Sequence, residues 1–168
     1  MIINPQYAIE SGWIRNILNV KRQLQPNGID LTVNSVQRPL LANHVSEIRS
    51  KNFPPSTFDP MIPDGDSKSV LLLPDSSPFY LINFNEIIKL PEGVAAVIFK
   101  RSTLNRMGHK LESGLWDSGF TGNLGCTVWP SHPLKIFSGD RLAQVVFFRA
   151  EVSGVLYDGD YQRQKNHS

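Results

Sequence analysis

Short apolar segments separated by turn residues restrict this chain to a β fold more firmly than any other feature of its sequence. Between residues 70 and 99 the apolar segments are Val70–Leu73, Phe79–Phe84, Ile87–Leu90 and Val94–Phe99. Pro74, Pro78 and Pro91-Glu92-Gly93 interrupt them. Closely and evenly spaced strands with turn signals between them predict an all-β barrel or jelly roll with few short helices.

The same pattern continues on both sides of this region. Further strands are expected at Ile29–Val33, Gly125–Trp129, Leu134–Phe137 and Arg141–Phe148. Apolar residues between Ile9 and Leu18 recur at helical spacing and predict a short helix that Gly12 ends. A helical turn is expected over residues 105–111.

Residues 43–68 are polar and rich in proline, which predicts an extended arm rather than a domain linker. Phe53, Phe58 and Met61 are expected to hold this arm against the body or against a neighbouring subunit. At 168 residues the chain is expected to form one domain, residues 1–168, with a polar tail over residues 157–168.

Composition excludes several classes of function. A net charge of +2 without a run of lysine and arginine gives no support for nucleic-acid binding. The single cysteine, Cys126, excludes an intramolecular disulfide and a cysteine-rich zinc site, and its strand-like surroundings favour a buried thiol. No apolar run approaches the roughly 18 residues of a membrane span. With no signal-peptide layout at the start, we expect a cytoplasmic protein.

The chemistry-bearing residues gather between Lys100 and Gly122. Arg101, Ser102 and Arg106 are donors that suit a phosphate chain, because guanidinium groups bind phosphate oxygens in a bidentate way. Asp117 follows within a glycine-framed hairpin that allows close backbone approach to a ligand. A carboxylate beside an anion site suggests a group that activates water.

Four segments in this order resemble the motifs of the dUTPase/dCTP deaminase superfamily. They are Asn27–Leu31, Arg101–Arg106, Gly114–Gly122 and Gly139–Gln144, and they span most of the chain. Each is weak alone, whereas the ordered set is specific. The resemblance implies a homotrimer of distorted jelly rolls whose active sites are shared between subunits. It also implies hydrolysis of dUTP to dUMP and pyrophosphate with Mg²⁺.

The resemblance further implies a role for each matching residue. Asp117 would be the general base for water attacking the α-phosphorus, and Asp30 would hold the metal-triphosphate through water. Phe120 would pack on the deoxyribose. The phosphates would be bound by Arg101, Ser102, Thr103, Arg106 and Gln144. The base would be read in the hairpin, at Gly125, Cys126 and Thr127, and Tyr161 and Gln164 in the tail would close over the phosphates.

Two other functions stay open at this point. The first is dCTP deamination, alone or combined with dUTP hydrolysis, because the opening Gln25–Asp30 and the tail resemble the deaminase branch and the glycine-rich tail motif of many dUTPases is missing. Against it, Thr127 occupies the position of the deaminase glutamate, and threonine is no acid or base at neutral pH. The nearest other carboxylates, Glu112 and Asp140, belong to different segments. The second is a nucleotide-binding protein without catalysis, which would not need Asp117.

Overall fold

The computed structural model describes residues 1–49, 51–59, 62–64, 67–151, 154–159 and 162. Three short helices and thirteen strands were assigned within them. The helices are α1 (Pro5–Glu10), α2 (Val20–Gln23) and α3 (Ser102–Arg106). The strands are β1 (Ile14–Arg15), β2 (Leu24–Gln25), β3 (Gly28–Pro39), β4 (Ser56–Asp59), β5 (Ile62–Asp64), β6 (Ser67–Leu72), β7 (Tyr80–Lys89), β8 (Val94–Lys100), β9 (Lys110–Glu112), β10 (Leu115–Trp116), β11 (Thr121–Trp129), β12 (Leu134–Phe137) and β13 (Arg141–Arg149).

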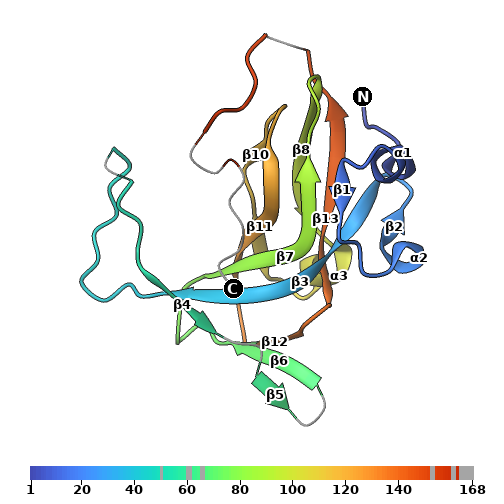
Figure 1. The fold of residues 1–168 in the computed structure, drawn as a ribbon. Helices are drawn as coiled ribbons and strands as arrows, with labels where there is room; N and C mark the ends of the chain where they lie inside the picture. Colours follow the sequence, from blue (N-terminus) through green and yellow to red (C-terminus); the bar gives the residue numbers. More distant parts are fainter. Residues whose placement is uncertain (50, 60–61, 65–66, 152–153, 160–161, 163–168) are drawn as a thin grey trace.

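The strands form one large curled sheet and one small sheet, both antiparallel (Figure 1). The large sheet has the order β10-β8-β13-β3-β7-β11-β9, and β1, β2 and β4 pair at its sides. Although β9 ends this order and β8 lies near its other end, the two strands are in contact. The sheet therefore closes toward a barrel, which confirms the predicted all-β class. Strands β12, β6 and β5 form the small sheet.

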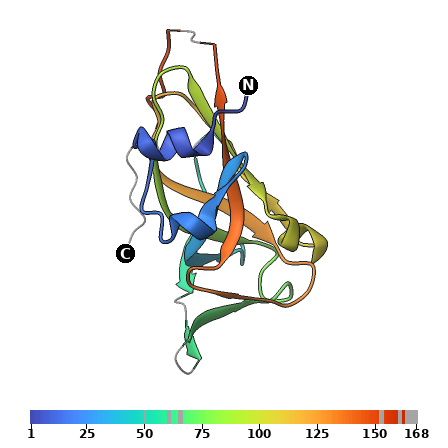
Figure 2. The ribbon, with the colours of Figure 1, turned by 90° about the vertical axis from the view of Figure 1, so that its right-hand side faces the viewer.

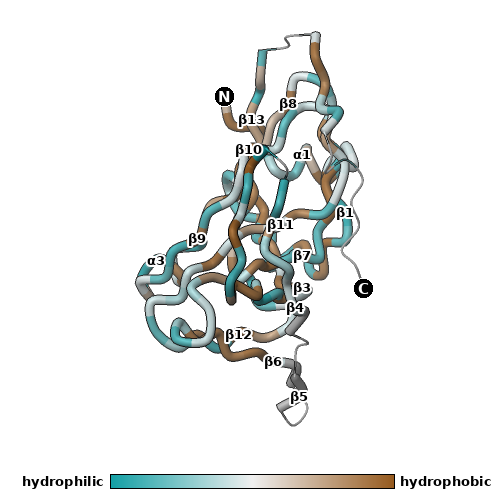
Figure 3. Tube along the Cα trace, turned by 90° about the vertical axis from the view of Figure 1, so that its left-hand side faces the viewer, coloured by the Kyte–Doolittle hydropathy of each residue, from teal (hydrophilic) through white to brown (hydrophobic). Residues whose placement is uncertain are grey.

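Alternating burial explains how the strands build the core. In β7 and β11 every second side chain is buried, as expected for strands with one face toward the interior. Tyr80, Phe84 and Phe147 are among the largest fully buried side chains. Each contributes roughly 1.5–3 kcal/mol relative to an exposed side chain. Figure 3 shows the hydrophobic stretches running along the strands in the interior.

Two local expectations change in the structure, and a third is confirmed. The segments Phe79–Phe84 and Ile87–Leu90 form a single strand, β7, in which Asn85 and Glu86 continue the alternation of burial. The helical turn expected over residues 105–111 lies earlier, at α3, and the chain is already extended at Lys110. The short N-terminal helix is confirmed as α1, whose first turn is capped by Asn4 and which ends before Gly12 at φ +70°.

The arm expected over residues 43–68 is only partly an arm. Its second part joins the body, because β4 pairs with β3 and β5 pairs with β6. Phe53 is 60% exposed, so most of its side chain does not pack on the body, and its alternative contact with a neighbouring subunit stays a prediction. Met61 and the side chain of Phe58 lie outside the described residues. None of the helices in the described part of the chain is long and apolar enough to cross a membrane.

Candidate functional site

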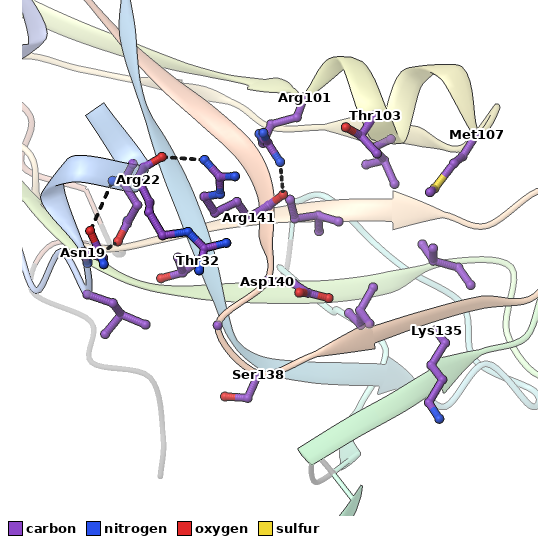
Figure 4. A pocket seen from close by; sticks show the side chains of 17 residues that line it. Asn19, Arg22, Thr32, Arg101, Thr103, Met107, Lys135, Ser138, Asp140 and Arg141 are labelled. Carbon is purple, nitrogen blue, oxygen red and sulfur yellow. Dashed lines mark hydrogen bonds between the residues drawn. The ribbon is translucent and has the colours of Figure 1, made fainter. Parts of the chain in front are cut away.

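A basic cavity of about 600 Å³ lies between α2, α3 and the turn from β12 to β13. Its cations come from all three regions: Arg22, Arg101, Lys135 and Arg141. Asp140 also lines it, but its Oδ2 accepts a hydrogen bond from the backbone N–H of Phe137 at 2.9 Å. Figure 4 shows Arg22 and Asn19 on one side of the cavity, and Thr103 and Met107 on the other. The cavity therefore suits an anion.

Asp30 is the buried carboxylate behind this cavity, and two arginines contact it. Its side chain is 1% exposed. Asp30 Oδ2 lies 3.0 Å from Arg101 Nε and 3.2 Å from Arg141 Nη1, while Gln144 Nε2 donates to Oδ1 at 3.4 Å. Burial raises the pKa of Asp30 above its ordinary value, and the two guanidinium groups oppose that shift. The contacts in this chain orient the arginines toward the cavity.

Gly28 permits the close packing that brings Gln144 to Asp30. A Cβ atom at this position would lie 2.6 Å from the carbonyl oxygen of Val145 and 2.8 Å from Gln144 Cγ. Because one of those atoms belongs to the backbone of β13, the strands would have to move apart.

We therefore expect Gly28→Ala to lower the free energy of unfolding by about 2–3 kcal/mol. Urea unfolding followed by tryptophan fluorescence measures this change. Gly114→Ala is the matched control, because a Cβ there would meet no atom within 4 Å. Equal stability of the two variants would contradict the close approach of β3 and β13.

The predicted phosphate-binding residues of α3 lie beside the cavity. Leu104 is buried and anchors the helix, whereas Ser102, Thr103 and Arg106 are exposed. Thr103 lines the cavity, and Arg101 precedes the helix and donates from Nη1 to the carbonyl of Arg141 at 2.9 Å. The structure thus brings Arg101, Thr103 and Arg141 to one cavity.

The hairpin that carries Asp117 forms a second, acidic cavity of about 530 Å³. Asp117 is exposed there, and Glu151 and Asp158 share the lining. Phe120 is buried against Trp116 and Tyr157, with ring centroids 4.8 and 5.4 Å away. Its predicted contact with a deoxyribose stays a prediction.

The tail contacts this hairpin through a residue that the sequence did not single out. Gln162 accepts a hydrogen bond from the backbone N–H of Thr121 at 2.8 Å and donates to the carbonyl of Gly119 at 3.0 Å. Tyr161 and Gln164, for which phosphate contacts were predicted, lie outside the described residues.

The predicted base-reading residues lie on β11 next to β9. Cys126 is buried, and burial raises the pKa of its thiol, which disfavours a reactive thiolate. Thr127 lies directly opposite Glu112, so both side chains lie on one face of the sheet. Glu112 is paired with Lys110 Nζ at 2.9 Å. The structure thus places a carboxylate beside Thr127, the position where the resemblance implies glutamate in a deaminase.

Within a single chain, Asp117 lies far from the basic cavity. Trp116 pairs with Ala96 near the start of β8, whereas Arg101 follows the last residue of that strand. Asp117 follows Trp116, so at the rise of an extended strand Asp117 and Arg101 lie roughly 15–20 Å apart. Figure 1 shows β10 along β8 and α3 beyond the other end of that strand. The acidic and basic cavities are therefore separate parts of one chain.

Comparison with known proteins places this arrangement in a family. The family described as dCTP deaminase-like matches residues 6–150. This chain belongs to the dCTP deaminase-like family. The family match covers every segment that lines the basic cavity and the Asp117 hairpin.

Curated relatives of this family member carry a hydrolase name. Proteins from Halobacterium salinarum (31% identical over 144 residues, 85% of each chain) and Aeropyrum pernix (33% over 146 residues, 83% of this chain and 84% of the relative) are both named probable deoxyuridine 5'-triphosphate nucleotidohydrolase. Among solved structures, the 2'-deoxycytidine 5'-triphosphate deaminase from Agrobacterium tumefaciens has a TM-score of 0.66 at 19% identity. That likeness covers 89% of this chain and 48% of the deaminase chain, and it shows a shared fold.

The sequence analysis did not assign Arg22, Arg141 or Glu86 to the basic cavity or its surroundings. Arg141 lies within the fourth motif together with Gln144, and this position could have indicated a role in the site. Glu86 falls on the buried face of β7, which the alternation of that strand indicates once its register is known. Arg22 carries no sequence signal, because only the packing of α2 brings it to the cavity.

His109, next to α3, gives the protein a titrating group in its interior. It is 1% exposed, and its ring lies 4.3 Å from that of His132. Its Nδ1 accepts the backbone N–H of Ser131 at 3.2 Å, so the neutral ring carries its proton on Nε2. Burial lowers the pKa of His109, and the charge of His132 adds to this effect.

A lowered pKa makes a histidine's contribution to stability depend on pH in one direction. The stabilising contribution of neutral His109 to the free energy of unfolding is complete above its ordinary pKa of 6.5. It is lost as the pH falls through the lower pKa that His109 has in the folded state. When the pH is lowered from about 8 to about 5, we expect the Tm of His109→Gln to fall by less than the Tm of the parent protein. His132→Gln, the control, should keep most of the decrease. Parallel melting curves for parent and His109→Gln would contradict this assignment.

Proposed function

We propose that this protein hydrolyses dUTP to dUMP and pyrophosphate. The observation that carries the proposal is the basic cavity, where Arg101 and Arg141 converge on buried Asp30. Guanidinium groups held in this way bind a phosphate chain, and phosphoryl transfer depends mostly on positioning and charge stabilisation. The names of the curated relatives support dUTP as the substrate.

The proposed reaction uses Asp117 as the general base. Asp117 takes a proton from water while the water oxygen bonds to the α-phosphorus and the bond from that phosphorus to the bridging oxygen breaks. Pyrophosphate leaves with the bonding electrons. Arg101, Ser102, Thr103, Arg106 and Gln144 hold the phosphates, as the resemblance implies. The β11 segment at Gly125, Cys126 and Thr127 reads the base, and Phe120 packs on the deoxyribose.

A shared site is part of the proposal. Asp117 and the basic cavity lie roughly 15–20 Å apart within one chain, too far for both to reach one α-phosphorus. A second copy that presents its Asp117 hairpin to this basic cavity would complete the site. We therefore keep the homotrimer that the resemblance implies, in the cytoplasm, with dUTP as the partner molecule.

Magnesium would enter with the nucleotide. The described residues contain no group of three side chains suited to hold a metal ion, and Asp30 contacts arginines and Gln144. Mg²⁺ prefers phosphate oxygens and waters to a protein cage, so we expect the nucleotide to supply most of its ligands. When bound, the ion neutralises phosphate charge. A contact of Asp30 with the ion through water stays a prediction, because the Asp30 carboxylate is buried and contacts Arg101, Arg141 and Gln144.

Deamination of dCTP is the second candidate, because Glu112 lies opposite Thr127. A carboxylate there could replace the deaminase glutamate if it were freed from Lys110. This candidate is the weaker one, because Thr127 is itself no acid or base and the curated relatives are named for dUTP hydrolysis.

Incubation with dUTP and with dCTP, each with Mg²⁺, separates these functions. Released pyrophosphate and ammonia are measured in both reactions. Pyrophosphate from dUTP without ammonia from dCTP is the expected result. Ammonia from dCTP would establish deamination, and neither product would indicate a binding protein without catalysis.

A further inference from the structure

Glu86 is a fully buried carboxylate behind the basic cavity, and its partners are all uncharged. Its side chain is 0% exposed. Glu86 Oε1 accepts hydrogen bonds from Gln23 Nε2 and from Thr32 Oγ1, each at 2.6 Å, and Oε2 accepts the backbone N–H of Thr32 at 3.0 Å. No cation among the described residues pairs with it. Burying a carboxylate without a cation costs free energy, so the presence of Glu86 here needs an explanation beyond packing.

The surrounding donors indicate that Glu86 acts as a pure acceptor. Asn85 Nδ2 donates to Thr32 Oγ1 at 3.1 Å, so the single proton of that hydroxyl is free to point at Glu86. Burial raises the pKa of Glu86, while the hydrogen bonds from Thr32 and Gln23 oppose the shift. A carboxylate that accepts from both residues fixes their side chains firmly.

Gln23 connects Glu86 to α2. Besides its bond to Glu86, Gln23 Nε2 donates to the carbonyl of Asp30 at 2.8 Å, and Gln23 Oε1 accepts the backbone N–H of Asn19 at 2.8 Å. The helix α2 has only four residues, and a helix this short is not stable by itself. Its position is therefore set by these tertiary contacts.

Arg22, the neighbour of Gln23, faces the basic cavity (Figure 4). Within the described chain its guanidinium has no hydrogen-bond or ion-pair partner, so it is available to a ligand. Its carbonyl accepts a hydrogen bond from Arg141 Nη1, the same atom that contacts Asp30. The α2 turn thus supplies one cation to the cavity and steadies another. Figure 2 shows the α2 turn (blue) and α3 (olive) on opposite sides of β13.

We propose that Arg22 is a further phosphate-binding residue and that Glu86 is the positioning residue that places it, acting through Gln23. The proposal rests on the function proposed above, since it assigns Arg22 to the phosphates of the nucleotide. The pyrophosphate part of dUTP is the chemical group that Arg22 would contact, because it enters a cavity that already contains Arg101 and Arg141.

The first test compares Arg22→Met with Lys21→Met. Lys21 is exposed on the same helix and does not line the cavity, so it controls for the loss of one positive charge. We expect Arg22→Met to raise the Kd of inorganic pyrophosphate and the KM of dUTP about 10-fold, with a smaller change in kcat. Lys21→Met should change both less than about two-fold. Equal effects of the two variants would overturn the assignment of Arg22.

The second test asks whether Glu86 acts through Arg22. We expect Glu86→Gln to raise the Kd of pyrophosphate by a similar factor, because its amide cannot accept from all three donors. The double variant Arg22→Met/Glu86→Gln should then bind no worse than Arg22→Met alone, since one effect depends on the other. Additive effects would show that Glu86 affects binding independently of Arg22, which would overturn its assignment as the residue that positions Arg22. If Glu86→Gln does not fold, Gln23→Leu breaks the same link and replaces it in the cycle.

Calorimetry with pyrophosphate keeps the two proposals separate. A protein that binds pyrophosphate through Arg22 but does not hydrolyse dUTP would contradict the proposed function and support this inference. A protein that hydrolyses dUTP while Arg22→Met leaves the Kd of pyrophosphate and the KM of dUTP unchanged would support the proposed function and contradict this inference.

Discussion

Asp117→Asn is expected to lower kcat for dUTP by about 10³-fold, because the amide cannot take the proton of the attacking water. Binding of the nucleotide should stay within about three-fold of the parent, since the phosphates and the base are assigned to other residues. Stability should also stay unchanged. Asp117 is exposed, and its backbone carbonyl accepts a hydrogen bond from Phe120 N–H that the substitution leaves in place.

Two measurements check this expectation. Pyrophosphate release gives kcat, and calorimetry with a non-hydrolysable dUTP analogue gives the Kd. Asp158→Asn is the matched control, because Asp158 lines the same acidic cavity without an assigned catalytic role. Near-parental turnover by Asp117→Asn with normal binding would remove Asp117 as the general base.

Two inactive variants are expected to restore activity when they assemble together. Asp117→Asn damages the acidic hairpin, and Arg106→Ala damages the phosphate side on α3. If each site combines the hairpin of one subunit with the α3 region of the next, random trimers of the two variants contain about one quarter intact sites. Their activity should therefore exceed that of either variant by roughly 10²-fold.

The mixed trimers are made by co-expression with two different affinity tags and sequential purification. Co-expression of Asp117→Asn with itself under both tags is the control and should stay inactive. A mixed preparation no more active than its better parent would mean that each chain builds its own site. That result would require the hairpin and α3 to approach one another within one subunit, against the separation along β8.

Much of the fold was predictable because local patterns report on strands directly. Alternation and turn residues located β3, β6, β8, β12 and β13, and Gly12 marked the end of the first helix. The division of β7 into two strands was wrong, because polar Asn85 and Glu86 look like a turn to a local pattern but lie within one continuous strand, where Glu86 is on the buried face. Burial of Glu86 depends on donors from Gln23 and Thr32, which local sequence does not reveal.

The sequence by itself determined the β class and the ordered motifs, because residue type, spacing and turn chemistry are properties of neighbouring residues. It also singled out Arg101 and Asp117 as candidate site residues, because their chemistry is explicit in their side chains. Only the tertiary structure decided which of these residues meet. Asp30 reaches Arg101 and Arg141, and Asp117 lies in a separate cavity, because strand register and curling bring together or hold apart residues that are distant along the chain.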